Sequence, residues 1–225
     1  MSAQPTSDRW FWDVPATPPD AAWRQKRRLA SALRELSALC VTSDAPDTML
    51  EGAADAVEQI VAQMTPYPTR TFQQGIASCT APADVHRFAD RGTMTGLCNP
   101  NSPPLLLSME GALAIGTVTF GPPFEGIPGH VHGGLVAAAF DQVFGYLQVK
   151  RGTGSVTSVL TVRYRRPTPI LVPLRIEARV LEAEGRKSVV AARMLAGDTV
   201  TAEADGIFIA LDSKRMHEIF SGKHD

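Results

Sequence analysis

Residues 132–141, His-Gly-Gly-Leu-Val-Ala-Ala-Ala-Phe-Asp, combine several groups that could do chemistry. From here to residue 147 the only side chains with polar groups after the histidine are those of Asp141, Gln142 and Tyr146, which predicts a helix that is hydrophobic nearly all round and buried. A buried carboxylate without partners is strongly penalised, and such groups are enriched where chemistry happens. Asp141 is therefore a candidate catalytic group, or else an aspartate held by structural hydrogen bonds.

Gly133 and Gly134 stand where this helix would begin. Unpaired backbone N–H groups and the positive end of the helix dipole favour a developing oxyanion at that point, and glycine lets a substrate approach closely. Taken alone, the two glycines equally suit a tight helix entry against a sheet, so the residue types leave both roles open.

Composition sets ordinary bounds on the 225 residues. With 44% hydrophobic residues the chain can bury a sizeable core, and we expect one domain with an extension, or one and a half domains. The net charge of -1 points to neither nucleic acid nor an anionic membrane surface. Cys40, Cys79 and Cys98 lack metal-type spacing and are odd in number, which fits a reducing compartment. We therefore expect a cytoplasmic protein without a secretory signal or a membrane span.

The first part of the chain predicts helices. Apolar residues recur at helical spacing over 20–40 and 47–64, and Asp47 is placed to cap the second helix. The basic run at 24–28 is typical of a solvated helix face, and we assign it no site. Residues 1–18 lack periodicity and predict an irregular arm that docks elsewhere on the protein.

The second part predicts strands around the apolar helix. After a long connection over 65–104, we expect a strand at 112–120 and a Gly/Pro-rich loop at 121–132. Four further strands follow the helix, and Gly185 and Gly197 mark turns between them, so this part should form an antiparallel meander. In the strand at 155–166, alternation predicts two faces. One face would hold Val156, Leu160, Val162 and Tyr164, and the other Thr157, Thr161, Arg163 and Arg165.

A long apolar helix enclosed by an antiparallel sheet and entered through His-Gly-Gly resembles the hotdog fold. His132-Gly133-Gly134, with Asp141 nine positions after the histidine, is similar to the signature of acyl-CoA thioesterases of the phenylacetate-pathway type. Four downstream segments resemble the mammalian-type thioesterase superfamily members 4 and 5 in order and spacing. They are Thr157, Arg163-Tyr164-Arg165-Arg166-Pro167, Glu184-Gly185-Arg186-Lys187 and Phe208-Ile209-Ala210-Leu211-Asp212.

This resemblance implies an α+β hotdog fold, an antiparallel sheet wrapped around a long central helix, with an N-terminal helical extension. It covers residues from about Asn99 to Asp212. We therefore divide the chain into an arm, helices and connecting loop (1–98), a hotdog thioesterase domain (99–212) and a C-terminal tail (213–225). The first 90 residues match much less specifically, and their function stays open.

The resemblance also implies an acyl-CoA thioesterase that needs no cofactor and no metal. Asp141 would be general base or nucleophile, the Gly133 and Gly134 amides oxyanion donors, and Thr157 the hydroxyl that orients water or the carboxylate. His132 would position the loop or the carbonyl, or be structural. Asp141 lies about 13.5 Å along the helix from His132, so a homodimer or dimer of dimers would build each site from two chains.

For coenzyme A, alternation places Arg163 and Arg165 on the strand face of Thr157, and Arg186 and Lys187 lie in the next hairpin. Alternation alone favours solvated arginines, whereas the family resemblance implies contact with the coenzyme A phosphates. Asn99 would line the acyl end. The acyl group itself cannot be predicted from these residues.

Other functions remain open. The hotdog fold also hosts acyl-CoA hydratases, whose His and Asp arrangement differs from this one. A non-catalytic acyl-CoA-binding or regulatory module would keep the fold and lose turnover. A serine hydrolase is disfavoured because the chain has no Gly-x-Ser-x-Gly elbow, and a metal hydrolase because its five histidines form no ligand cluster.

Overall fold

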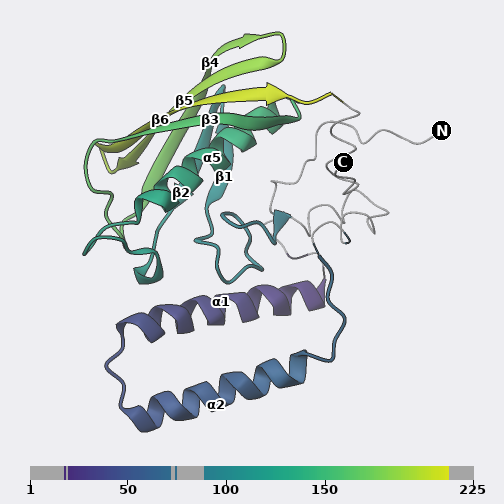
Figure 1. Ribbon diagram of the computed structural model, residues 1–225, viewed down its shortest axis with the longest axis vertical. Coiled ribbons are helices and arrows are strands. Elements are labelled where there is room, and N and C mark those ends of the chain that lie inside the picture. Colours follow the sequence, from purple (N-terminus) through teal and green to yellow (C-terminus); the bar gives the residue numbers. More distant parts are fainter. Residues whose placement is uncertain (1–17, 19, 72–73, 75–88, 213–225) are drawn as a thin grey trace, which may run out of the picture.

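In a computed structural model, which describes residues 18, 20–71, 74 and 89–212, a six-stranded antiparallel sheet curls around one long helix, α5 (Figure 1). The strands lie in the order β1-β2-β4-β5-β6-β3. Their bounds are β1 Leu106–Glu110, β2 Leu113–Val118, β3 Ser155–Tyr164, β4 Leu174–Glu184, β5 Lys187–Ala196 and β6 Thr199–Ala210. The helices are α1 Ala21–Thr42, α2 Asp47–Met64, the short η1 Pro122–Phe124 and α5 Gly133–Lys150. This is the α+β hotdog fold that the sequence predicts.

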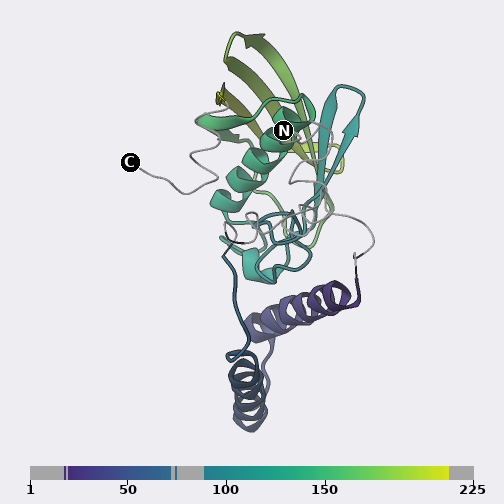
Figure 2. The same cartoon turned by 90° about the vertical axis from the view of Figure 1, so that its right-hand side faces the viewer.

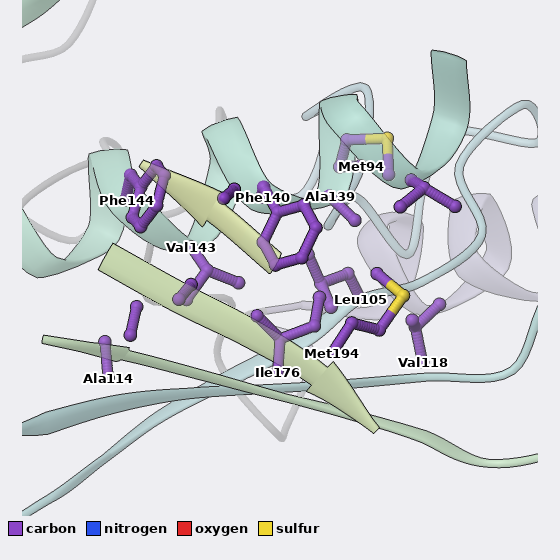
Figure 3. Close-up of a cluster of buried hydrophobic side chains, with 14 of the residues drawn as sticks. Met94, Leu105, Ala114, Val118, Ala139, Phe140, Val143, Phe144, Ile176 and Met194 are labelled. Carbon is purple, nitrogen blue, oxygen red and sulfur yellow. The ribbon is translucent and has the colours of Figure 1, made fainter. Parts of the chain in front are cut away.

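The core lies between α5 and the concave face of the sheet. Figure 3 shows Phe140, Val143 and Phe144 of α5 pointing toward Ile176 of β4 and Met194 of β5, and all five side chains are buried. Strand β4 alternates as a half-buried strand should, because its apolar residues at 174, 176 and 178 are buried while the charged residues between them are not. Burial of this apolar surface is the main force that holds the helix to the sheet.

The approach of α5 to the sheet is unusually close at Gly116 of β2. A β-carbon at this residue would lie 2.6 Å from Cγ2 of Val143, which no real contact allows. The absent side chain therefore lets the middle of α5 sit directly on β2, and this contact fixes how deep the helix lies.

The expectation of a single strand at 112–120 was incomplete. The segment pairs with an additional strand, β1, which lies between the connection expected to end at residue 104 and the strand expected to begin at 112. The two strands join at Gly111, whose φ of 60° suits glycine, and their pairing begins at Glu110 and Leu113. The hairpin was missed because the outer strand has only a weak alternation of polar and apolar residues.

The two N-terminal helices extend away from the sheet, and both views place α1 between the sheet domain and α2 (Figures 1 and 2). The expected helices at 20–40 and 47–64 are confirmed, but Asp47 does not cap the second one. Pro46 is its N-cap residue, and no side chain bonds to that end of the helix. The arm expected over 1–18 lies almost wholly outside the described residues. None of the described helices is both long enough and apolar enough to cross a membrane.

Asp90 attaches α1 to the sheet domain. Its carboxylate is fully buried and accepts hydrogen bonds from Trp23 Nε1 at 2.6 Å and Arg27 Nε at 2.7 Å, both on α1. It also accepts the backbone N–H of Leu97 at 3.0 Å and the thiol of Cys98 at 3.2 Å. Burial and the hydrogen bond to Asp90 raise the pKa of the Cys98 thiol to about 12, so this thiol stays protonated at neutral pH.

Replacing Asp90 by alanine should destabilise the fold strongly, because it leaves a largely buried guanidinium and a buried indole N–H without their acceptor. We expect a loss of about 3–5 kcal/mol in the free energy of unfolding. Urea denaturation of Asp90→Ala, compared with Asp44→Ala in the exposed α1–α2 connection, measures the loss. Equal midpoints for the two variants would show that Asp90 does not anchor α1.

Candidate active site

Helix α5 begins at a capped glycine pair. His132 is the N-cap residue, and its Nδ1 accepts the N–H of Gly134 at 3.1 Å. The N–H of Gly133 has no acceptor among the described residues. His132 thus has a structural role at the helix start, which the sequence left undecided between structure and chemistry. One of the two expected oxyanion donors is unpaired, and the other is held by this imidazole.

Tyr164, the last residue of β3, adds a contact that the sequence analysis missed. Its hydroxyl donates a hydrogen bond to the carbonyl oxygen of Gly133 at 2.8 Å. That carbonyl and the N–H of Gly134 belong to the same peptide unit, so the tyrosine fixes the orientation of the helix entry. Alternation alone placed Tyr164 with Val156 on an apolar face. The available signal was its position inside the family-like Arg-Tyr-Arg-Arg-Pro segment.

An open cavity of about 560 Å³ lies at this end of α5. The residues that matter for its chemistry are His130, His132, Gly133, Tyr164, Arg165 and Arg166. The helix start therefore faces a space lined by Gly133, whose N–H has no acceptor among the described residues, and by two arginines, a combination that suits an anionic ligand or a developing oxyanion.

Asp141 lies further along α5, on the side that faces β3. The hydroxyl of Thr157 donates to Asp141 Oδ1 at 2.7 Å, so the structure brings these two predicted site residues together. Asp141 is half-buried, not buried as expected. In a single chain the sheet covers one side of α5 and leaves the side that includes Ala138, Asp141 and Gly145 partly open.

The prediction that Arg163 and Arg165 share a strand face with Thr157 is wrong. The pairing of β3 with β6 shifts its register between Thr157 and Val159. Thr157 is opposite the buried Phe208 on the helix side of the sheet, whereas Arg163 is opposite Glu203. The irregularity at residue 158 reverses the alternation beyond it, because an extra residue in one strand turns every later side chain to the other face.

On that outer face the arginines join a ladder of ion pairs across the sheet. Arg163 pairs with Asp205, and Arg165 with Glu203 at 2.7 Å. The ladder continues through Arg193 and Arg175 to the carboxylates of Glu177 and Glu110. Hydrogen bonds from the two arginines lower the pKa of Glu177. Because these pairs are largely exposed, solvent screens them, and we interpret the ladder as a solvated outer surface.

The other predicted coenzyme A contacts lie apart from the cavity. Arg186 is in the β4–β5 turn and donates from Nε to the carbonyl of Ala210 at 2.9 Å. Lys187 begins β5 at the end of the sheet where β3 also begins. Asn99 is held in its loop, because its side-chain amide donates to the carbonyl of Gly92 at 3.3 Å. None of the three lines the cavity at the start of α5.

The part of the chain that forms this site is similar to known thioesterases. Residues 128–203, which include α5, β3, β4 and β5, match the family model described as Thioesterase superfamily. The chain is 32% identical over 93 residues to acyl-coenzyme A thioesterase THEM4 of Mus musculus, covering 40% of each. It is 36% identical over 93 residues to THEM4 of Xenopus laevis, covering 40% of this chain and 42% of that protein.

A third relative is acyl-coenzyme A thioesterase THEM5 of Homo sapiens, 32% identical over 89 residues and covering 39% of this chain and 36% of that protein. The chain thus spans about two fifths of the length of the curated relatives it matches. A crystal structure of a thioesterase superfamily protein superimposes with a TM-score of 0.71 at 26% identity, covering 87% of this chain and 98% of that one. The resemblance to the thioesterase family is confirmed.

Proposed function

We propose that this member of the thioesterase superfamily is an acyl-CoA thioesterase that hydrolyses an acyl-CoA thioester to a free carboxylic acid and coenzyme A. The observation that carries the proposal is the hydrogen bond between Thr157 and Asp141 on a helix that opens with the Gly133–Gly134 pair. The names of the curated relatives, which are acyl-coenzyme A thioesterases, support the same activity.

Asp141 is the group that activates the attack. Thr157 holds Oδ1, which leaves Oδ2 to face a water molecule or the substrate. As general base, Asp141 takes a proton from water while the water oxygen bonds to the thioester carbon; the C–S bond then breaks and the coenzyme A thiolate takes up a proton. As nucleophile, Oδ2 itself attacks the carbon, the thiolate leaves, and water hydrolyses the resulting anhydride.

The tetrahedral intermediate carries a negative oxygen, for which the start of α5 provides donors. The unpaired N–H of Gly133 is the first donor, and the N–H of Gly134 becomes the second when it turns from His132 Nδ1 to the oxyanion. Tyr164 holds the peptide between the glycines, and its hydrogen bond to the Gly133 carbonyl polarises that unit. Tyr164 is thus a positioning residue.

The two halves of the chemistry require two chains. Asp141 and Gly133 are separated by eight residues of one helix, about 12 Å, which is too far for both to act on one thioester carbon. Strand β3 lies at an edge of the described sheet and exposes Val156, Val159 and Tyr164. Pairing of β3 with a second copy in a homodimer covers this edge and brings Asp141 of one chain to the helix start of the other.

Coenzyme A phosphates fit the cationic groups near the cavity. Arg165 and Arg166 line it, and Arg166 makes no ion pair among the described residues, so its guanidinium can bind phosphate bidentately. Arg186 and Lys187 offer further positive charge at the opposite end of β3. We assign phosphate contact first to Arg166, and then to Arg186 and Lys187 at the other end of β3. Arg163 and Arg165 are less suited, because both pair with carboxylates on the outer face of the sheet.

The main alternative is a non-catalytic acyl-CoA-binding module with the same fold. The positioned Thr157–Asp141 pair disfavours it, because binding an acyl chain does not need a hydroxyl aimed at a carboxylate on the half-open side of α5. The hydrogen bond between Thr157 and Asp141 does not favour an acyl-CoA hydratase either. The acyl-chain length and the division of the chain at 98/99 stay predictions, and Met94, which precedes that boundary, packs in the core.

Replacing Asp141 by asparagine should reduce thioester hydrolysis at least about 1,000-fold, since the amide can neither take a proton nor attack. Thr157→Val should cost about 10- to 100-fold, while Thr157→Ser retains most activity because the hydroxyl is kept. Release of free thiol from a panel of acyl-CoA esters measures both effects. If wild type binds acyl-CoA but releases no thiol from any ester, the binding-module function replaces the enzyme.

Replacing Tyr164 by phenylalanine should lower kcat about tenfold and leave KM within about twofold, because it removes one hydrogen bond from the peptide that binds the transition state. The exposed Tyr67→Phe at the end of α2 is the matched control and should change neither constant. A purely structural role for Tyr164 predicts a different pattern, a lower melting temperature with kcat unchanged. Steady-state kinetics and thermal unfolding on the same samples separate the two.

A further inference from the structure

Helix α1 has two faces with different surroundings. One face, Trp23, Arg27, Ala30 and Arg34, contacts the sheet domain through Asp90 and through the carbonyls of Leu97 and Asn99. The opposite face holds an apolar stripe at helical spacing, which we call the α1 stripe. It consists of Leu29, Ala32, Leu33, Leu36, Leu39 and Cys40. Leu36 is 38% exposed and Leu39 58% exposed, so in a single chain this stripe meets water.

Helix α2 has no buried residue at all. Its apolar residues form a second stripe, the α2 stripe, in a three-and-four repeat along the whole helix. It consists of Leu50, Ala53, Ala54, Val57, Ile60, Val61 and Met64. Ile60 is 47% exposed and Met64 53% exposed. An 18-residue helix that buries nothing is marginal in water, so α2 requires a surface that covers this stripe.

The width of the stripes indicates how many neighbours each helix has. In a two-stranded coiled coil, two of every seven residues are apolar and face the partner helix. In these stripes a third residue of every seven is apolar, for example Leu33 and Val61, which is typical of the core face of a helix in a bundle. One hairpin gives each helix one neighbour. The helices run antiparallel in Figure 1, yet α1 and α2 do not pack closely against each other. A second hairpin is needed to cover both stripes.

The charges of the helices identify a hairpin that fits. Helix α1 carries five basic residues and one acidic residue, and α2 carries four acidic residues and no basic one. None of the α2 carboxylates makes an ion pair with another described residue. A hairpin with one cationic and one anionic helix is complementary to itself, because a two-fold axis places α1 of each copy beside α2 of the other.

We infer that the α1 and α2 stripes are covered by the same hairpin of a second copy of this chain, so that two hairpins form a four-helix bundle. The bundle lies on the far side of α1 from the sheet domain, and Asp90 holds it there through Trp23 and Arg27. This contact is separate from the β3 edge. It therefore joins two chains whether or not the proposed thioesterase activity is correct.

Disulfide trapping between distinguishable chains tests this inference. A tagged chain with Leu36→Cys and an untagged chain with Ile60→Cys are coexpressed, both with Cys40→Ser and Cys79→Ser, and oxidised. Cys98 stays in place because its raised pKa and its bond to Asp90 keep the thiol protonated. A disulfide joining a tagged to an untagged chain can form only between copies.

We expect the covalent pair to contain most of the protein, at least about ten times the yield of a control in which Ala62→Cys, on the far face of α2, replaces Ile60→Cys. A single chain carrying both Leu36→Cys and Ile60→Cys should then form the pair between copies as well. Two results together would overturn the inference: an intrachain disulfide in that double variant, and a yield of linked tagged and untagged chains no higher than in the Ala62 control. They would show that the hairpin closes on itself. Absence of both disulfides would equally overturn the inference.

Discussion

The packing of α5 on the concave face of the sheet is the constraint on which the rest of the molecule depends. Val143 occupies the place that a side chain at Gly116 would take, and Phe140 and Phe144 fill the space beside it. With the middle of the helix fixed in this way, its N-terminus must open into the cavity at Tyr164. Asp141, about two turns further on, must then face Thr157 on the edge strand. Core packing thus sets the geometry of the chemistry.

The same packing leaves part of α5 and of the sheet uncovered in one chain. Because the sheet covers only one side of α5, the carboxylate and the small residues around it stay half-exposed. The adjoining strand β3 has no strand beyond it among the described residues and carries exposed apolar side chains. An apolar edge strand next to a half-covered helix is a costly surface in water. The homodimer that we propose would bury this edge and supply the distant donor pair, so that folding energetics and the proposed catalysis would favour the same association.

Much of this structure could be predicted from the sequence where a local pattern controls it. The apolar run after the glycines specifies α5, and the glycine turns at 185 and 197, each with positive φ, specify the meander of β4, β5 and β6. The family resemblance assigned Asp141 and Thr157 to one site, and in the structure the Thr157 hydroxyl lies 2.7 Å from Asp141 Oδ1. These features depend on periodicity, turn chemistry and a motif, all of which are visible in the chain itself.

The features that the sequence could not predict depend on irregular geometry or on contacts between distant residues. One displaced residue after Thr157 turns Arg163 and Arg165 to the outer face, and alternation contains no signal for it. Tyr164 and Gly133, which are hydrogen-bonded, are 31 residues apart in the sequence, and Trp23 and Asp90 are 67 residues apart. Such pairs arise only after the sheet has closed on α5, when burial makes an unpaired donor or acceptor costly.

Subunit complementation tests the central claim, a catalytic site shared between two chains. Asp141→Asn removes the carboxylate from one chain, and Gly134→Pro removes the backbone N–H from another, at a helix position that tolerates proline. Each variant alone should be inactive. Coexpressed as a heterodimer, the two should recover about half of the wild-type thiol release, because one of the two sites then combines Asp141 with the intact glycine pair. A heterodimer as inactive as its parents would contradict the account, because it would place Asp141 and Gly134 of one chain in the same site.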